Sequence, residues 1–144
     1  MTAPLKIGVA GLGTVGCGLI SLLAKREQDI ASRAGREIVV TAVSVRNRSR
    51  DRGIALDGCR WFDDAVQLAT AADIDVVVEL IGGACGVAKS LSEAAIAAGK
   101  HLVTANKALI AHHGTELAKS AEAAGVTLAY EAAVAGGIPI VRAL

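Results

Sequence analysis

The chain alternates between short apolar runs and longer segments with helical periodicity. Residues 7–10, 37–45 and 75–81 are nearly continuous in apolar and β-branched side chains. Runs of this kind are typical of parallel strands buried on both faces, because a strand with one solvated face alternates apolar and polar residues. Residues 101–104 and 126–130 predict two further strands.

Helical segments separate the predicted strands. Residues 14–26 predict the first helix, and the polar stretch 27–36 extends or ends it. Apolar residues at positions 87, 88, 91, 94, 95 and 98 recur with the spacing of one helix face, and residues 115–124 repeat this pattern. The glycines that cap the C-terminal ends of these last two helices are Gly99 and Gly125.

The region after the second apolar run is the least regular. Residues 46–60 are basic and contain glycine. We expect Trp61 and Phe62 to pack beside the edge of the sheet. The acidic pair 63–64 is typical of a helix start, and apolar residues within 65–69 share one face of that helix.

Strands and helices that alternate with short connections require right-handed crossovers and a parallel sheet. We therefore predict an α/β fold with a Rossmann-type, doubly wound parallel sheet in three layers. The length of 144 residues suits one domain. Pro139 lies at a predicted first helical position, and the sequence stops within the second turn of that helix. We expect residues 1–144 to be the N-terminal domain of a longer protein.

Composition and charge narrow the class of partner. The net charge of +1 provides no overall attraction to nucleic acid or to acidic membranes. Residues 7–24 carry no charge, but their glycines and the lack of a small-residue cleavage site favour a strand, turn and helix over a signal peptide or membrane anchor. We expect neither nucleic acid nor membrane as a partner.

The cysteines indicate a reducing compartment. Cys17, Cys59 and Cys85 have unrelated spacings that match no metal motif, and their odd number argues against a disulfide framework. A packing role is favoured for Cys17 over a reactive one. We expect a cytoplasmic protein.

A glycine motif follows the first apolar run and leads directly into the first predicted helix. In such a motif the first glycine permits a tight turn, the second lets the backbone approach a pyrophosphate, and the third lets the helix pack close to the strand. The helix start offers unpaired N–H groups and a positive dipole end to the anion. A glycine-rich turn without a ligand is the alternative. The predicted dinucleotide-binding residues are Gly11, Leu12, Gly13, Thr14, Val15 and Gly16.

The end of the second predicted strand bears on the choice of dinucleotide. NAD sites commonly place an acidic residue there, to bind the ribose 2′-OH. Here Arg46 follows the strand, and no carboxylate precedes Asp51. Arg46, with Arg48, offers guanidinium groups to a 2′-phosphate, so we predict NADP in preference to NAD. The spacing from the glycine motif exceeds the usual length of about 20 residues, which requires a longer first helix. A solvated basic loop is the alternative, and it is the expected state of Arg50 and Arg52.

Ligands of such sheets bind beyond the carboxyl ends of the strands. Lys107 closely follows the fourth predicted strand, where its ammonium can bind a substrate carboxylate or stabilise an oxyanion; a solvated surface lysine is the alternative. Thr104 and Asn106 can hydrogen-bond a carboxamide, and capping of the next helix is equally plausible for Asn106. The adjacent His112 and His113 are expected to be exposed.

Four segments, in order, carry a resemblance to a known family. They are residues 11–16, 77–83 (Val-Val-Glu-Leu-Ile-Gly-Gly), 103–111 (Val-Thr-Ala-Asn-Lys-Ala-Leu-Ile-Ala) and 131–140 (Glu-Ala-Ala-Val-Ala-Gly-Gly-Ile-Pro-Ile). Together they resemble the nucleotide-binding domain of homoserine dehydrogenase over essentially the whole chain. The resemblance implies NAD(P)-dependent interconversion of L-homoserine and L-aspartate 4-semialdehyde, in the biosynthesis of threonine, methionine and isoleucine.

The resemblance also implies roles for individual residues. Residues 12–16 correspond to the pyrophosphate loop, and Arg46 to the basic residue near the adenosine ribose. Lys107 matches the first of two active-site lysines, close to nicotinamide and substrate. A further set matches a monovalent-cation site, usually sodium, and oxygen ligands suit such a hard cation. That set is Glu131, Val134, Gly136 and Ile138.

Two features depart from the family pattern. Residues 84–87, Ala-Cys-Gly-Val, stand where the family usually has an acidic residue followed by Pro-Ala. The second lysine and the homoserine-binding acids belong to the family's substrate domain, beyond Leu144, so we expect the isolated chain to bind dinucleotide without turnover. The resemblance further implies a homo-oligomeric full-length protein. The alternatives are a related enzyme, such as an aspartate dehydrogenase or an imine-reducing enzyme, and a non-catalytic dinucleotide sensor.

Overall fold

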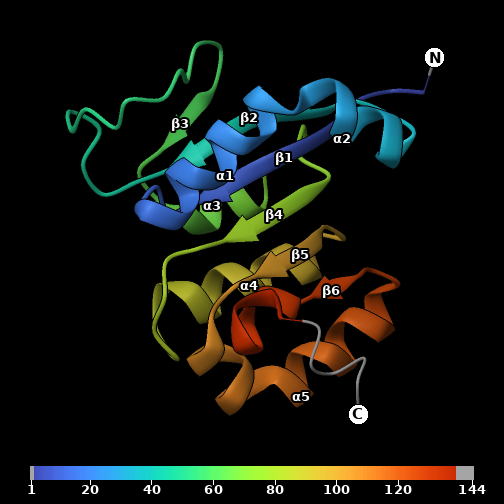
Figure 1. Cartoon of the computed structure of the whole chain (residues 1–144). Coiled ribbons are helices and arrows are strands. Elements are labelled where there is room, and N and C mark those ends of the chain that lie inside the picture. The colour runs from blue at the N-terminus through green and yellow to red at the C-terminus, as the bar shows by residue number, and fades with distance from the viewer. Residues whose placement is uncertain (1, 139–144) are drawn as a thin grey trace.

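The computed structural model describes residues 2–138, which form one sheet with helices on both faces (Figure 1). The sheet has the strand order β3-β2-β1-β4-β5-β6, and every neighbouring pair is parallel. The predicted doubly wound α/β fold is therefore confirmed. The strands are β1 (Leu5–Ala10), β2 (Ile38–Ser44), β3 (Arg60–Phe62), β4 (Val76–Glu79), β5 (His101–Thr104) and β6 (Leu128–Ala129).

The helices complete the three predicted layers. On one face, α1 and the β2–β3 connection pack against the sheet, and on the other face α3, α4 and α5 do so (Figure 1). Among residues 2–138, no helix has both the length and the apolar character needed to cross a bilayer. The helices are α1 (Thr14–Lys25), α2 (Glu27–Ala34), α3 (Ala65–Ala69), α4 (Val87–Ala97) and α5 (Lys107–Ala124), followed by the short 3-10 turns η1 (Glu131–Ala133) and η2 (Ala135–Gly137).

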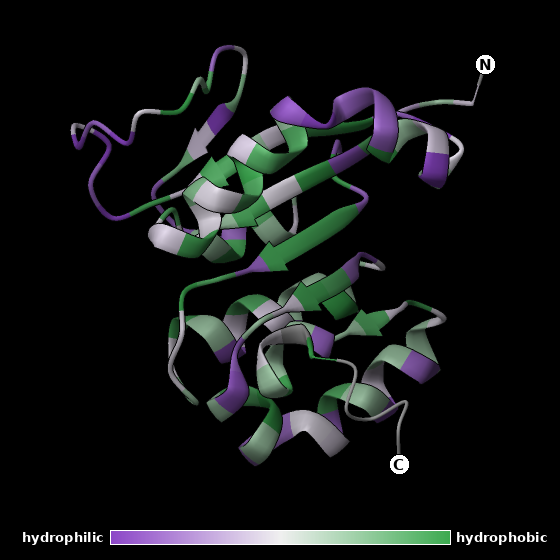
Figure 2. Cartoon of the chain, viewed as in Figure 1, coloured by the Kyte–Doolittle hydropathy of each residue, from purple (hydrophilic) through white to green (hydrophobic). Residues whose placement is uncertain are grey.

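Two apolar clusters fill the spaces between the layers. One includes Leu68, Leu91 and Leu102, and joins α3, α4 and α5 to the sheet. The other includes Val9 and Ile20, and joins α1 to the opposite face. Figure 2 shows the apolar side chains concentrated along the strands, whereas α2 is largely hydrophilic. Helix α2 therefore contributes little to the core, and none of its residues is buried.

The structure resolves the ambiguous segment 27–36 as a separate helix, α2, which ends at Gly35 in a left-handed conformation (φ 73°). This second helix, and not a longer first one, accounts for the long spacing between the glycine motif and Arg46. Strand β3 was not predicted, because its three residues, Arg60–Phe62, follow an irregular basic segment. Trp61 and Phe62 lie at the sheet edge as expected.

Several predicted boundaries were wrong: β1 begins at Leu5 and β6 spans only Leu128–Ala129, and two further differences have a cause in side-chain hydrogen bonds. Helix α5 begins at Lys107 instead of residue 115, because the Asn106 side chain accepts a hydrogen bond from the Leu109 N–H and caps the helix. Strand β4 ends at Glu79 instead of residue 81, because the Glu79 carboxylate accepts hydrogen bonds from the N–H groups of Ile81 and Gly82. The helix predicted from Pro139 lies outside the described residues.

The close contact between α1 and the end of β1 predicts that a larger residue at Gly16 destabilises the fold. Gly16→Ala should lower the free energy of unfolding by about 1–3 kcal/mol, because a Cβ there would lie 2.1 Å from the Gly11 carbonyl oxygen. Gly18→Ala is the matched control in the same helix: nothing lies within 4 Å of its Cβ, so alanine should raise stability by about 0.5–1 kcal/mol. Urea unfolding measures both. Equal effects would contradict the close contact.

Candidate functional site

The glycine motif forms the turn from β1 into α1, and its three glycines have different surroundings. Gly11 has a φ of +99°, and a Cβ there would lie 2.6 Å from the Leu80 carbonyl oxygen. A Cβ at Gly16 would lie even closer to a backbone atom, 2.1 Å from the Gly11 carbonyl oxygen. At Gly13, in contrast, a Cβ would have nothing within 4 Å of it. The fold itself therefore requires the outer two glycines, whereas Gly13 leaves the front of the loop open to an approaching group.

The start of α1 is prepared for an anion. Its N-cap, Gly13, provides no side-chain hydrogen bond, and the first turn contains no acidic residue. The first backbone N–H groups of any helix lack partners within the helix, and the dipole adds positive charge at this end. Open space at Gly13 and uncapped N–H groups together fit a diphosphate.

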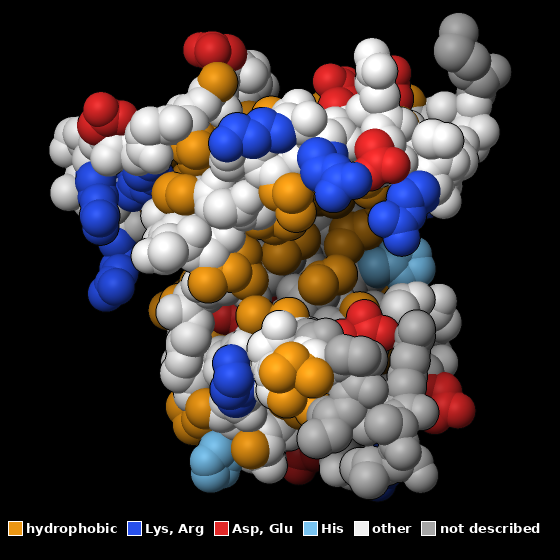
Figure 3. Space-filling view, in the orientation of Figure 1, with side chains coloured by type: hydrophobic (Ala, Val, Ile, Leu, Met, Phe, Trp, Pro, Cys, Tyr) orange, Lys and Arg blue, Asp and Glu red, His pale blue; other side chains and the backbone are white. Residues whose placement is uncertain are grey.

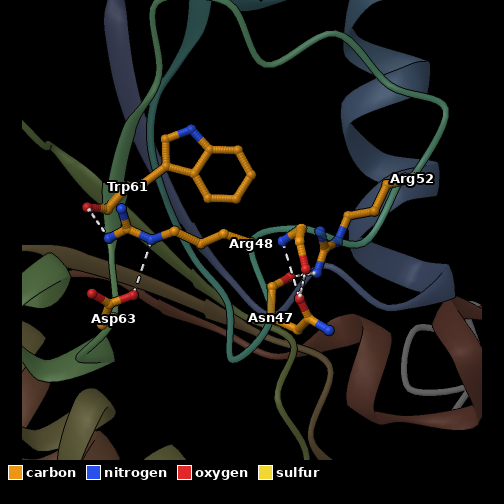
Figure 4. Close-up of polar contacts among 6 residues, drawn as sticks. Asn47, Arg48, Arg52, Trp61 and Asp63 are labelled. Carbon is orange, nitrogen blue, oxygen red and sulfur yellow. Dashed lines mark hydrogen bonds and ion pairs between the residues drawn. The ribbon is translucent and has the colours of Figure 1, made fainter.

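Arg52 binds this loop through a backbone carbonyl group. Its Nε donates to the Leu12 carbonyl oxygen at 3.2 Å, and one terminal nitrogen donates to the Arg50 carbonyl oxygen at 2.8 Å. The other terminal nitrogen donates to the Asn47 carbonyl oxygen at 2.6 Å (Figure 4). The expectation that Arg52 is a solvated loop residue was therefore wrong. Its guanidinium joins the basic segment after β2 to the glycine motif.

The other arginines of this segment differ in how much they are engaged. Arg48 pairs with Asp63 at 2.9 Å and donates to the Trp61 carbonyl oxygen at 3.1 Å (Figure 4). Arg46 is exposed two residues beyond the end of β2. Figure 3 shows Lys and Arg side chains gathered over this β2–β3 segment. Of the two arginines predicted to face a 2′-phosphate, Arg46 is thus the more available.

A pocket of about 150 Å³ opens between the first turn of α1 and the carboxyl ends of β4 and β5. This is the crevice where strand order reverses, next to β1, and ligands of such sheets bind there. Two apolar side chains face solvent at this place: Val15 is 62% exposed and Ile81 is 39% exposed. Exposed apolar surface beside an anion site suits a flat ring system. The lining residues are Val15, Leu80, Ile81, Gly82, Ala105 and Asn106.

A larger hollow of about 430 Å³ lies at the junction of α1 and α2. One continuous stretch of chain, residues 24–29, lines it. It lies at the opposite end of α1 from the glycine motif, so the helix N–H groups do not face it. We assign it no role.

A buried carboxylate organises the loops on the far side of the crevice. Glu79 is fully buried at the end of β4. Its Oε1 accepts hydrogen bonds from the N–H groups of Ile81 at 2.8 Å and Gly82 at 3.1 Å. Its Oε2 accepts from the Thr104 hydroxyl at 2.5 Å. Both oxygens of the buried group are thereby satisfied, as a carboxylate in this position requires.

Asn106 extends this network into the next loop. Its N–H donates to the Thr104 hydroxyl oxygen at 3.0 Å, and its Nδ2 donates to the Gly83 carbonyl oxygen at 2.7 Å. Its Oδ1 caps α5, which is one of the two roles that the sequence left open. The Thr104 side chain is fully buried and its hydroxyl is bonded to Glu79, and the predicted contact between Thr104 and a cofactor stays a prediction.

Lys107 is exposed at the first position of α5, directly after Asn106. A cation at a helix N-terminus opposes the helix dipole, so this lysine does not stabilise the helix it begins. Its place at the crevice edge fits the predicted role toward a substrate oxygen, which stays a prediction.

The residues predicted to bind a cation lie together at the C-terminal end of the described chain. Glu131 is exposed at the start of η1, and Val134 is half-buried after it. Ala135 and Gly136 both have positive φ, 48° and 66°, and a non-glycine residue in this conformation marks a strained turn. Ile138 follows and is exposed. Within residues 2–138, His, Cys, Asp and Glu side chains form no group of three or more that could hold a metal, so backbone oxygens would have to supply most ligands.

Comparisons with known proteins agree with this geometry. The family described as "Homoserine dehydrogenase, NAD binding domain" matches residues 11–131. The chain is 48% identical over 143 residues to a homoserine dehydrogenase of Pseudomonas aeruginosa, and 45% identical over 141 residues to one of Neisseria gonorrhoeae. Each match covers 98% of this chain and 32% of the relative.

Solved structures give the same result. A homoserine dehydrogenase from Thiobacillus denitrificans superposes with a TM-score of 0.89 at 45% identity, over 98% of this chain and 32% of that chain. One from S. aureus superposes with a TM-score of 0.83 at 33% identity, over 93% of this chain and 34% of that chain. The chain thus spans about a third of the length of the relatives it matches.

The buried network predicts a stability effect. Thr104→Val keeps the shape of the side chain but leaves a Glu79 oxygen and the Asn106 N–H without partners, so the free energy of unfolding should fall by about 1–3 kcal/mol. Thr127→Val, at an exposed position before β6, is the matched control and should change stability by less than about 0.5 kcal/mol. Denaturant unfolding measures both. A neutral Thr104→Val variant would contradict the network.

Proposed function

We propose that this chain, which belongs to the family of homoserine dehydrogenase NAD-binding domains, is the dinucleotide-binding part of an NADP-dependent homoserine dehydrogenase. The observation that carries this proposal is the uncapped start of α1 behind the open face of Gly13. The diphosphate would lie against the backbone N–H groups of residues 12–16. The intact enzyme would interconvert L-homoserine and L-aspartate 4-semialdehyde.

The crevice provides the environment for the chemistry. When bound there, the nicotinamide supplies a hydride acceptor or donor. Val15 and Ile81 offer apolar surface to its ring, and the network of Glu79 and Asn106 fixes the loops on which the ring would rest. Lys107 would bind a substrate oxygen with its ammonium group, and so orient the reacting carbon or stabilise charge that develops on the oxygen.

The charges near the end of β2 favour NADP over NAD. Arg46 is exposed at the end of β2, where an NAD site commonly has a carboxylate. The first carboxylate in the segment, Asp51, accepts a hydrogen bond from the Gly53 N–H instead. Arg48 and Arg52 are held by protein groups, so Arg46 is the guanidinium we assign to the 2′-phosphate.

We also propose a monovalent cation, sodium, at the strained turn after β6. The support is the resemblance at Glu131, Val134, Gly136 and Ile138 together with the positive φ of Ala135. A monovalent ion held mainly by carbonyl oxygens is consistent with a segment that carries one carboxylate.

A cytoplasmic homo-oligomer is the expected state of the whole protein.

The cofactor assignment has a direct test. Arg46→Ala should weaken NADPH binding about 10- to 100-fold and leave NADH binding nearly unchanged, because it removes a charge-assisted hydrogen bond worth about 1.5–3 kcal/mol. Arg50→Ala, the matched control, removes the same charge from the same exposed segment and should have a much smaller effect. Isothermal titration measures the affinities. Equal losses of NADPH affinity in the two variants would contradict a specific contact between Arg46 and the 2′-phosphate, and would indicate a general effect of positive charge.

A second test separates dinucleotide binding, which we assign to this chain, from turnover, which we assign to the intact enzyme. The isolated chain should bind NADPH but show no homoserine-dependent reduction of NADP, since the family's substrate-binding residues lie outside it. Absorbance of the reduced nicotinamide follows turnover, and titration follows binding. Measurable homoserine oxidation by residues 1–144 would contradict this assignment.

A further inference from the structure

The β4–α4 loop holds a cysteine that the proposed cofactor site does not use. Cys85 is exposed, and its Sγ lies 3.8 Å from Nε2 of His113 in α5. His113 is 21% exposed, and its Nδ1 lies 3.9 Å from Oε2 of Glu116, one helical turn further. Thiol, imidazole and carboxylate are thus arranged in sequence. In such a pair the imidazole can take the proton of the thiol. The carboxylate, which lies beyond hydrogen-bond distance of the ring, adds only a weak charge interaction.

The other two cysteines direct their thiols at backbone oxygens. Cys17 Sγ donates to the Leu12 carbonyl at 3.5 Å, and Cys59 Sγ donates to the Val40 carbonyl at 3.3 Å. Both are half-buried. Burial, and then the nearby Asp57, raise the pKa of Cys59. Cys85 is therefore the cysteine that combines access with a basic partner, and the other two serve as internal controls.

The surroundings of Cys85 leave it open and place positive charge nearby. Gly83 and Gly86 flank it with positive φ, and neither brings a side chain that could cover the thiol. Lys89 lies in the first turn of α4, and its hydrogen-bonded ion pair with Glu93 raises the pKa of Lys89, which keeps it an ammonium. The thiol is therefore accessible, and an ammonium group lies nearby.

We propose that Cys85 and His113 form a thiol-exchange site that takes up a mixed disulfide from a small disulfide of the glutathione type. His113 Nε2 accepts the thiol proton, and Cys85 Sγ attacks one sulfur of the disulfide. A bond forms between these two sulfurs, the original S–S bond breaks, and the departing thiolate takes the proton from the imidazolium. Cys85 is oxidised while one half of the small disulfide is reduced, so no other oxidant enters the step.

The adduct would act on the adjacent crevice. Gly83, two residues before Cys85, is held through its carbonyl by Asn106 Nδ2, and Ile81 and Gly82 line the pocket. A bulky group on Cys85 would displace this short loop and weaken dinucleotide binding. This consequence rests on the proposed function, whereas the exchange reaction itself does not.

The reaction is tested with glutathione disulfide on the full chain, with adducts measured at each cysteine by peptide mass mapping. Cys85 should react at least about tenfold faster than Cys17 or Cys59, and dithiothreitol should reverse the adduct. His113→Asn should slow the reaction of Cys85 about tenfold, because an ordinary thiol is only a few per cent thiolate at neutral pH. His112→Asn, which changes the adjacent exposed histidine, is the matched control and should leave the rate unchanged.

Glu116→Gln should slow the reaction only about twofold, because a carboxylate that is 80% exposed interacts weakly with its partner. Equal rates at Cys85 in the wild-type chain and His113→Asn would overturn the proposal. The adduct should bind NADPH about fivefold more weakly than the reduced chain, and an unchanged affinity would overturn the link to the crevice. Failure of the reduced chain to bind NADPH would contradict the proposed function instead, and the exchange rates would still decide this proposal.

Discussion

The arrangement of the candidate site depends on one buried carboxylate. The Glu79 carboxylate accepts from the N–H groups of Ile81 and Gly82 just after β4, and it also accepts from the Thr104 hydroxyl at the end of β5. Asn106 then links the β5–α5 loop back to Gly83. One connected set of hydrogen bonds thus fixes both loops, so the crevice is shaped before any ligand arrives. Preformed geometry of this kind lowers the ordering cost of binding.

The other side of the crevice depends on close backbone contact. Helix α1 can approach the end of β1 because Gly16 presents no side chain to Gly11, and Gly11 in turn passes close to Leu80. Arg52 fixes the Leu12 carbonyl from the opposite side. These contacts hold the loop that would present its N–H groups to an anion.

Features with a local pattern could be predicted from the sequence, and features that join distant residues could not. Apolar runs predicted the main strands, and the sequence offered Asn106 as a helix cap or as a partner of a carboxamide without deciding between them. The contact between Arg52 and Leu12 spans 40 positions, and that between Cys85 and His113 spans 28, so no periodicity reveals them. Their partners become neighbours only because the parallel sheet brings the ends of successive strands to one edge.

The outermost strands have a further consequence for the behaviour of the molecule at high concentration. β3 comprises three residues and β6 only two. Edges this short expose few free peptide groups to which a foreign strand could add. The sheet of the described chain thus ends in edges that discourage fibril-like growth, although its central strands are strongly apolar.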